Sequence, residues 1–343
     1  MKNRTNSLIF WLKGNIITID LFLTTIRKKL HKLNNIELSI VVPCFNEEPS
    51  VPLFYKAVEQ LKDKLPKYEY IFVDDGSSDS TLNELKQLHA KNEAVHYVSF
   101  SRNFGKESAI YAGLATAKGN YVVLMDADLQ DPPELLPKMY QLITDQDKHY
   151  DVITTRRTTR TGEKEGLSFL SHAYYYVINK ISNVHMSPDQ RDYRMMTRQV
   201  VNNYLKLKEV SRFSKGLFAW EGFHQYELSF PNHERAAGES HWGIRKLFKY
   251  ALTSITDFSE APLKLATYLG GIFSLMAFIG IIYVIIRKII NPSVAIMGWS
   301  SLACLILLMG GINLLCIGII GMYLEKIYQQ AKNRPIYLVR EQA

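Results

Sequence analysis

The stretch that decides the fold is residues 38–80, LSIVVPCFNEEPSVPLFYKAVEQLKDKLPKYEYIFVDDGSSDS. It begins with an apolar run at 38–43, continues through an amphipathic segment at 51–65 and ends with a second apolar run at 69–74. A polar turn follows each apolar run. Short apolar runs joined by a segment of helical length predict two parallel strands connected by a helix.

The same alternation continues along the chain to residue 155. We expect further strands at 95–100, 121–125 and 151–155, and further helices at 81–91, 108–118 and 134–144. This order predicts an α/β fold with a Rossmann-type, mostly parallel sheet and helices on both of its faces. In such sheets, ligands bind beyond the carboxyl ends of the strands.

Acidic and amide side chains follow three of these strands. They lie in Asn46-Glu47-Glu48, in Asp74-Asp75-Gly76-Ser77-Ser78-Asp79 and in Asp126-Ala127-Asp128-Leu129-Gln130-Asp131. A single acid at a strand end often only caps the next helix, and Asp79 before Thr81 fits that alternative. Three clusters at one edge of a sheet need a cation or the donor groups of a ligand to balance their charge.

Asp126 and Asp128 form the most informative pair in these clusters. Residues two apart on an extended chain point the same way, so both carboxylates can reach one hard cation. Mg²⁺ or Mn²⁺ suits such an oxygen-rich site, with diphosphate oxygens as further ligands. Asp-X-Asp alone is a weak motif, and its position beside the other two clusters makes it specific.

The C-terminal third of the chain is much more apolar than the rest. The whole chain has 343 residues, of which 47% are hydrophobic, and residues 265–286 and 293–324 contain no charged side chain. About 20 apolar residues span a bilayer core, so both runs are long enough. We expect two transmembrane helices, since the alternative of two buried core helices does not explain charge-free runs of this length.

The net charge of +8 favours anionic partners. Next to membrane spans, we expect these to be an anionic lipid and an anionic substrate rather than nucleic acid. Two of the three cysteines, Cys304 and Cys316, fall in the second apolar run, which excludes a disulfide framework and favours a reduced, cytoplasmic catalytic part. More Lys and Arg residues lie before the first apolar run and after the second than in the loop between the two runs. This distribution predicts that both termini are cytoplasmic.

These patterns divide the chain into six segments. We expect an N-terminal extension at 1–36, a cytoplasmic catalytic domain at 37–239, a juxtamembrane amphipathic helix at 240–261, transmembrane helices at 262–288 and 293–324, and a cytoplasmic tail at 325–343. For 1–36, an interfacial helix is favoured over a disordered extension. A further amphipathic stripe at 167–181 is typical of a helix packed on the sheet.

Four motifs together resemble a known family. They are Val42-Pro43-Cys44-Phe45-Asn46-Glu47-Glu48, Val73-Asp74-Asp75-Gly76-Ser77-Ser78-Asp79, Ser101-Arg102-Asn103-Phe104-Gly105-Lys106-Glu107 and Met125-Asp126-Ala127-Asp128-Leu129-Gln130-Asp131-Pro132-Pro133. In this order they resemble family 2 glycosyltransferases, which have a GT-A fold. More narrowly, the chain is similar over about 38–338 to polyprenyl-phosphate glycosyltransferases such as bactoprenol glucosyltransferase and dolichyl-phosphate mannose synthase.

The resemblance implies roles for individual residues. The nucleotide-sugar donor would contact Pro43, Phe45, Glu47, Asp74, Asp75, Lys106 and Asp126. Mg²⁺ or Mn²⁺ would be held by Asp126, Asp128 and Gln130. The catalytic residues would be Asp128 and Asp192, the latter being the candidate acid of the family. Phe45 stands where the family often has Tyr, so we expect one hydroxyl contact with the donor to be absent. Cys44 stands where the family often has an aliphatic residue, and we expect this difference to be harmless.

Arginine makes a separate case for an anionic acceptor, because it binds phosphate oxygens bidentately. The candidate ligands of an acceptor phosphate are Arg156, Arg157, Arg160 and Arg194. For any single arginine the alternative is ordinary surface charge. Three of them in one loop, at the open edge of an anion site and near membrane helices, favour a lipid phosphate.

We therefore expect a glycosyltransferase of the plasma membrane, multi-pass and homo-oligomeric, with its catalytic domain on the cytoplasmic face. By resemblance, it transfers glucose from UDP-glucose to undecaprenyl phosphate with inversion, for glycosylation of the cell envelope. UDP-N-acetylglucosamine and GDP-mannose remain open as donors. An inactive membrane scaffold on the same fold is disfavoured, because the motif residues are all present. Gly105-Lys106 does not form a P-loop, since position 100 is Phe and Glu107 replaces Ser or Thr.

Overall fold

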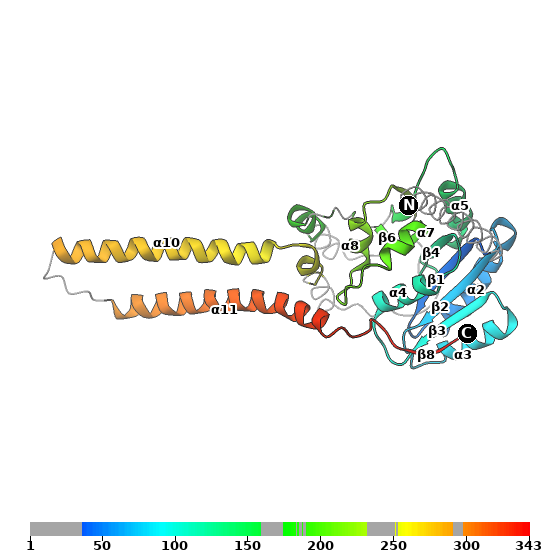
Figure 1. The fold of residues 1–343 in the computed structure, drawn as a ribbon, viewed down its shortest axis with the longest axis horizontal. Coiled ribbons are helices and arrows are strands. Elements are labelled where there is room, and N and C mark those ends of the chain that lie inside the picture. The colour runs from blue at the N-terminus through cyan, green and yellow to red at the C-terminus, as the bar shows by residue number, and fades with distance from the viewer. Residues whose placement is uncertain are drawn as a thin grey trace, which may run out of the picture.

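The computed structural model describes residues 36–158, 174–182, 184, 187, 190–231, 251, 253–290 and 298–343. Its centre is an eight-stranded sheet with the order β7-β5-β6-β4-β1-β2-β3-β8 (Figure 1). The strands are β1 (Leu38–Cys44), β2 (Tyr68–Asp74), β3 (Val95–Phe100), β4 (Tyr121–Leu124), β5 (Val152–Arg157), β6 (Gln190–Thr197), β7 (Gln225–Phe230) and β8 (Val339–Gln342).

Most of the strands run in one direction. β1 pairs in parallel with both β2 and β4, β2 with β3, and β5 with β7. Only β6 and β8 run against their neighbours. The α/β fold with a mostly parallel sheet is confirmed, and the five expected strands lie within about two residues of their expected positions. β6, β7 and β8 were not predicted from the sequence.

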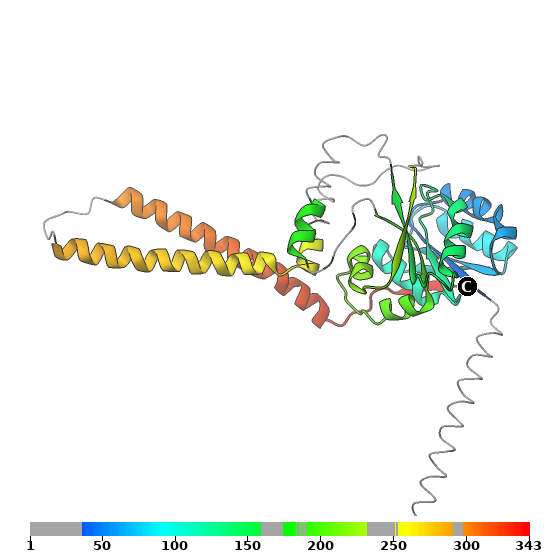
Figure 2. The ribbon, with the colours of Figure 1, turned by 90° about the horizontal axis from the view of Figure 1, so that it is seen from above.

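Helices cover both faces of the sheet (Figure 2). They are α2 (Ser50–Glu59), α3 (Thr81–Lys91), α4 (Lys106–Thr116), α5 (Leu136–Ile143), α7 (Arg198–Tyr204) and α8 (Ser214–Trp220), with short 3₁₀ turns at Lys62–Lys64 and Pro133–Leu135. Alternate strand residues serve opposite faces: Ile40 and Val42 join the core under α2, α3 and α5, while Val41 joins the core under α4, α7 and α8. The expected helix at 51–65 is shorter, ending at Glu59.

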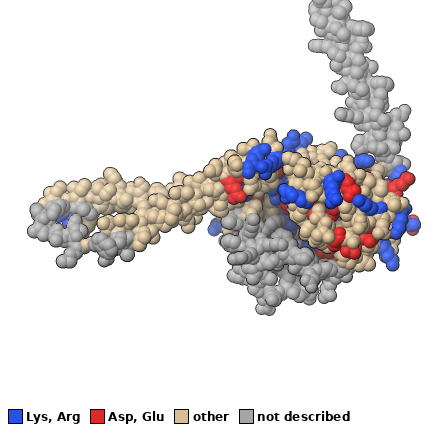
Figure 3. Space-filling model, turned by 90° about the horizontal axis from the view of Figure 1, so that it is seen from below, with Lys and Arg blue, Asp and Glu red and all other residues tan. Residues whose placement is uncertain are grey.

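Two long helices leave the α/β domain side by side (Figures 1 and 2). They are α10 (Ala261–Ile290) and α11 (Trp299–Ala331), and each holds a segment long and apolar enough to cross a membrane, Ala261–Arg287 and Leu305–Ala331. Most of their large apolar side chains are exposed, and charged residues gather mainly on the α/β domain (Figure 3). The second helix runs beyond the expected end at 324.

The expected tail at 325–343 is built into the rest of the structure. Its first part belongs to α11, where Tyr323 Oη donates to the Ser259 carbonyl at 2.6 Å and Lys326 pairs with Asp257. Its last part is β8, which pairs with β3 at the edge of the sheet. Several expected parts lie outside the described residues. They are 1–35 of the N-terminal extension, Arg160, 167–173 of the amphipathic stripe, and residues 240–250 and 252 of the juxtamembrane helix.

Gly113 sets how closely α4 approaches the sheet. A Cβ atom at this position would lie 2.3 Å from Val41 Cγ1 and 3.2 Å from Val73 Cγ2. We expect Gly113→Val to lower the free energy of unfolding by about 2 kcal/mol or more, because overpacking a buried interface is costly. Ala115→Val on the exposed face of α4 is the matched control, with an expected loss of about 0.5–0.7 kcal/mol from helix propensity. Equal losses in urea denaturation would contradict this view of the interface.

Candidate active site

Each of the loops that follow β1 to β4 turns at a residue with positive φ. These residues are Asn46 (55°), Gly76 (66°), Gly105 (97°) and Leu129 (57°). The conformation is uncommon for residues other than glycine, and such strain is concentrated at functional sites. A Cβ atom on Gly76 would lie 2.4 Å from the carbonyl carbon of Arg102, so the second and third loops touch through their backbones. We call these four segments the strand-end loops.

The first two strand-end loops are joined by hydrogen bonds. The amide of Asn46 donates to Ser77 Oγ at 2.9 Å, and the amide of Ser78 donates to Asn46 Oδ1 at 2.9 Å. The amide of Glu47 donates to Thr81 Oγ1 at 2.8 Å. Glu47 therefore lies at the rim beside the second loop, as expected from the parallel pairing of β1 and β2.

The other expected donor residues of β1 and β2 differ in their exposure. The Phe45 side chain is 42% exposed at the rim, and Pro43 is half-buried just before it. Asp74 is buried, with Oδ1 accepting from the Ser77 amide at 3.0 Å and Oδ2 accepting from Ser99 Oγ at 2.8 Å. Phe45 is thus available to a ligand, whereas the Asp74 carboxylate holds neighbouring protein groups in place.

The Asp75 carboxylate holds the third strand-end loop. It accepts hydrogen bonds from the amides of Phe104 at 2.6 Å and Gly105 at 2.9 Å. Burial raises the pKa of Asp75 to about 6, although these two amide donors oppose the rise. Gly105 immediately precedes Lys106, the first residue of α4, so this carboxylate fixes where α4 begins.

Lys106 lies between two carboxylates that come from different strands. Its Nζ is 2.7 Å from Asp126 Oδ1 and 2.8 Å from Asp192 Oδ2. Burial alone lowers the pKa of Lys106, but the charges of Asp126 and Asp192 outweigh it and raise the pKa. Burial raises the pKa of Asp192, and Lys106 with Lys215 more than reverses this, so Asp192 is an ionised carboxylate. We call these three residues the Lys106 cluster.

The loop after β4 carries the expected metal ligands. Asp128 is 7% exposed, and its Oδ1 accepts from the Gln130 amide at 3.1 Å. The Gln130 side chain accepts from Arg157 Nη2 at 3.0 Å. Asp126, Asp128 and Gln130 therefore lie in one loop, with Arg157 from β5 reaching across to it.

Asp131, at the end of the same loop, joins it to Arg191 on β6. It is fully buried, and its Oδ1 is 3.0 Å from Arg191 Nε, while its Oδ2 has no hydrogen-bond partner. Burial raises the pKa of Asp131 to about 6 despite Arg191, and the charges of Asp126 and Asp128 add to the rise. Three carboxylates of this loop, those of Asp126, Asp128 and Asp131, therefore lie close enough to interact.

The donor set fits a hard divalent cation. Asp126 and Asp128 offer carboxylate oxygens and Gln130 offers an amide oxygen, which are the ligand atoms that hard divalent cations prefer. In the part of the chain that the structure describes, no three His, Cys, Asp or Glu side chains form a ready-made metal site. Lys106 already contacts Asp126, so ligands beyond these side chains must come from a substrate or water.

Of the four expected acceptor arginines, the structure describes Arg156, Arg157 and Arg194, and each of these makes different contacts. Arg156 is partly exposed, 3.4 Å from Glu227 Oε1, and Arg157 contacts Gln130. Arg194 is 2% exposed and donates to the carbonyls of Asp192 at 3.3 Å and Arg191 at 3.2 Å, with its guanidinium over the Phe218 ring. Arg194 lies two residues further along β6 than Asp192, opposite Leu124 of β4 and Thr154 of β5, and is therefore in the core.

Two residues beside the Lys106 cluster were missed by the sequence reasoning. Lys215 on α8 donates to the Gln190 carbonyl at 3.0 Å and helps to lower the pKa of Asp192. Glu107 accepts from the amide of Ser214 at 2.9 Å and from its hydroxyl, and burial raises the pKa of Glu107 to about 7. Lys215 belongs to none of the four motifs. Glu107 ends the third motif but had no role assigned, because its partner Ser214 on α8 meets α4 only in the folded chain.

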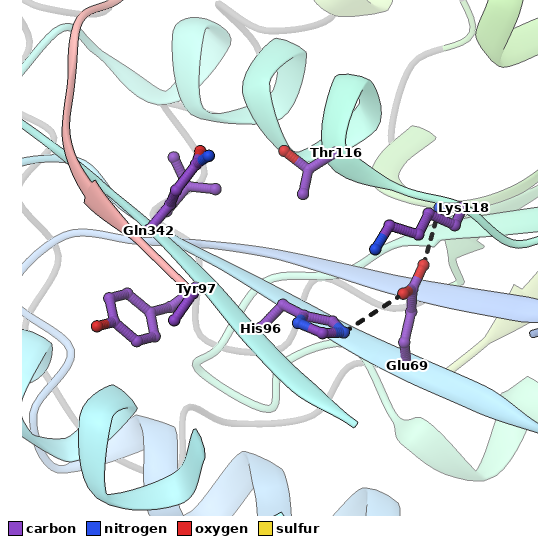
Figure 4. Close-up of a pocket in the computed structure, with 8 residues that line it drawn as sticks. Glu69, His96, Tyr97, Thr116, Lys118 and Gln342 are labelled. Carbon is purple, nitrogen blue, oxygen red and sulfur yellow. Dashed lines mark hydrogen bonds and ion pairs between the residues drawn. The ribbon is translucent and has the colours of Figure 1, made fainter. Parts of the chain in front are cut away.

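A separate cavity of about 430 Å³ lies at the amino ends of the parallel strands (Figure 4). Its walls include Glu69, which accepts from Ser39 Oγ at 2.6 Å and from the Lys118 amide at 2.8 Å, and lies 3.7 Å from His96 Nε2. None of the site residues expected from the sequence lines it. Glu69 ties together the beginnings of the strands, while the strand-end loops occupy the opposite edge.

The strand-end acids, the Lys106 cluster and the sheet define a class of protein. Residues 39–205 match the family described as Glycosyl transferase family 2. An uncharacterized glycosyltransferase of Synechocystis sp. is 41% identical over 307 residues, covering 89% of this chain and 95% of that protein. The chain therefore belongs to glycosyl transferase family 2 and is a glycosyltransferase, as its motifs predicted.

Two further proteins with named activities are similar to this chain. The SfII prophage-derived bactoprenol glucosyl transferase of Shigella flexneri is 36% identical over 308 residues, covering 89% of this chain and 98% of that protein. The solved structure of glucosyl-3-phosphoglycerate synthase from Mycobacterium tuberculosis, in complex with Mn²⁺, UDP-glucose and phosphoglyceric acid, has a TM-score of 0.42. It is 20% identical and covers 65% of this chain and 78% of that one, a likeness too small to bear on ligands.

The raised pKa of Glu107 has a consequence for stability. Its usual value is 4.5 and its folded value about 7, so between these pH values the unfolded chain loses the proton while the folded chain keeps it. The contribution of Glu107 to the free energy of unfolding must therefore fall as pH rises from about 4.5 to 7. We expect the free energy of unfolding of Glu107→Gln, relative to that of the wild type, to increase by about 1–3 kcal/mol between pH 5 and pH 8.

The measurement is urea denaturation of the purified protein at several pH values. Glu93→Gln, at an exposed position, is the surface control for removing one glutamate. Parallel pH curves for the wild type and Glu107→Gln would show that the burial of Glu107 does not govern its ionisation.

Proposed function

We propose that this protein transfers glucose from UDP-glucose to undecaprenyl phosphate, with inversion at the anomeric carbon. The observation that carries the proposal is the Lys106 cluster beside Asp128, with Arg157 held against Gln130. Lys106 and Arg157 can neutralise the charge of phosphate groups at this edge, and the carboxylates beside them can hold a metal ion. A reaction between two phosphate-bearing substrates needs both. Relatives named bactoprenol glucosyl transferases support the choice of acceptor and sugar.

The nucleotide-sugar would occupy the carboxyl edge of β1, β2 and β4. Pro43, the exposed Phe45 ring and Glu47 would line the nucleoside, since aromatic faces stack on bases. Asp74 and Asp75 would act by holding the loops around it. The Lys106 ammonium, which contacts the carboxylates of Asp126 and Asp192, would also contact the anionic diphosphate.

Asp126, Asp128 and Gln130 would hold a divalent cation, Mg²⁺ or Mn²⁺. When bound, this ion supplies Lewis-acid stabilisation of the departing diphosphate. The protein's own contribution is to fix the loop that carries these ligands. Asp128 and the Gln130 amide brace each other, and Arg157 orients the Gln130 side chain.

The acceptor chemistry needs little base catalysis. A phosphate monoester has a second pKa of about 6 and is already largely anionic near pH 7. Its oxygen would attack the anomeric carbon while the bond from that carbon to the diphosphate oxygen breaks. Arg156, Arg157 and Arg160 would hold the attacking phosphate, and Asp192 would orient it or take a residual proton. Arg194 would act indirectly, by supporting the backbone of Asp192.

The long helices suit a lipid acceptor. We propose that α10 and α11 cross the plasma membrane and that the α/β domain lies on the cytoplasmic side, where the strand-end loops meet the phosphate of the lipid. This explains why a domain with a charged site carries a long apolar hairpin. The lipid-linked sugar would then serve glycosylation of the cell envelope.

The proposal is tested by product analysis. The full-length protein in lipid vesicles is incubated with undecaprenyl phosphate, Mg²⁺ or Mn²⁺, and UDP-glucose, UDP-N-acetylglucosamine or GDP-mannose, and the lipid product is identified by mass. We expect a hexosyl product from UDP-glucose that disappears in Asp128→Ala and remains in the surface control Asp145→Ala. A product from another donor replaces the donor assignment, and no glycosylated lipid from any donor overturns the acceptor.

The role of Asp192 gives a second test. Because the acceptor is largely anionic, we expect Asp192→Asn to reduce kcat less than Asp128→Ala does with saturating metal. The readout is the initial rate of lipid glycosylation at pH 7 and pH 8. If both variants lose activity equally, Asp192 acts as an essential base and the positioning role is wrong.

A further inference from the structure

The chain returns from α11 to the catalytic sheet. β8 pairs with β3, the edge strand of the parallel part, with Val98 opposite Gln342 and Phe100 opposite Val339 (Figure 1). Just before β8, the Leu338 carbonyl accepts a hydrogen bond from the Ser101 amide at 3.0 Å. The C-terminal segment therefore reaches the point where β3 ends and the third strand-end loop begins.

Tyr337 lies at this point, between the two elements that the third loop connects. Its ring stacks on Phe100, the last residue of β3, with centroids 4.9 Å apart and planes inclined by 20°. On its other side, the ring of Tyr111 on α4 is 6.4 Å away. Phe100 in turn packs edge-on against Phe104, in the loop itself, at 5.7 Å. Tyr337 thus belongs to an aromatic group that spans β3, the loop and α4.

This loop carries groups that the Lys106 cluster depends on. The amides of Phe104 and Gly105 bind Asp75, and Lys106 follows directly. The middle of the loop, Arg102 and Asn103, is exposed. The backbone of this middle part lies against Gly76. Tyr337 packs against Phe100 at the end of β3 and against Tyr111 in the middle of α4, the helix that follows the loop.

We propose that Tyr337 is a positioning residue of the donor site. Its ring fixes the spacing between the end of β3 and the middle of α4, and so helps to place the Phe104 and Gly105 amides and Lys106 between them. The segment between α11 and β8 is short, so the same residue joins a proposed membrane helix to the nucleotide end of the site. The inference rests on the proposed function, in which Lys106 contacts the donor diphosphate.

The experiment compares Tyr337→Ala, Tyr337→Phe and Glu341→Ala in the full-length protein in lipid nanodiscs. UDP binding with Mn²⁺ is measured by calorimetry, and kcat and KM for UDP-glucose are measured separately. We expect Tyr337→Ala to weaken UDP binding about three- to tenfold, the size expected for losing one or two aromatic pairs. KM should rise more than kcat falls, and Tyr337→Phe should restore both, because the ring makes the contacts.

Glu341→Ala is the matched control on the same strand. It removes the ion pair of Glu341 with Lys86 at 2.8 Å, which is partly exposed and lies away from the third loop. UDP binding of this variant should equal that of the wild type. If Glu341→Ala weakens binding as much as Tyr337→Ala, β8 acts only through general stability and the inference is wrong.

A readout without nucleotide separates this inference from the donor assignment. Hydrogen exchange followed by mass spectrometry should show faster exchange of the amides at 101–105 in Tyr337→Ala than in the wild type and in Glu341→Ala. Unchanged exchange there overturns the positioning role of Tyr337. Failure of the wild-type protein to bind UDP, with faster exchange in the variant, overturns the donor assignment and leaves the positioning of the loop in place.

Discussion

The ion contacts of Lys106 with Asp126 and Asp192 are the constraint on which the rest of the site depends. The Lys106 ammonium is held between both carboxylates by their attraction, although its side chain is 41% exposed and solvent weakens each pair. The ammonium therefore lies at the junction of β4, β6 and α4. Movement of these elements would separate the opposite charges, so the cluster joins the three elements at this edge.

The backbone around the cluster is shaped to keep the charges in reach. Asn46 and Leu129 adopt positive φ values without being glycines, and Gly76 allows two loops to touch. Asp75 and Asp131 are buried carboxylates with raised pKa values, one held by backbone amides and the other by an arginine. Strain and buried charge are thus concentrated at one edge, while the apolar layers on both faces of the sheet supply the stability that tolerates them.

The two long helices give the same edge a second environment. The α/β domain, with its charged edge, is joined to a hairpin of exposed apolar side chains, and the chain then returns to complete the sheet with β8. Contacts of Lys326 and Tyr323 with the segment before α10 fix the base of the hairpin. The apolar hairpin and the charged edge are therefore parts of one folded unit, linked at the start of α10 and at the end of α11.

The sequence by itself determined the parallel half of the sheet, the acids at its strand ends and the two apolar helices, because each depends on local periodicity or on neighbouring residues. Asp126 and Asp128 follow one strand, so their shared edge was predictable. Only the tertiary structure decided that Asp192 meets Lys106, that Arg194 is buried and that Tyr337 packs on β3. These depend on the antiparallel strands β6, which lies between β4 and β5, and β8, which pairs with β3 at the edge of the sheet. Such pairings join distant segments, and no local pattern encodes them.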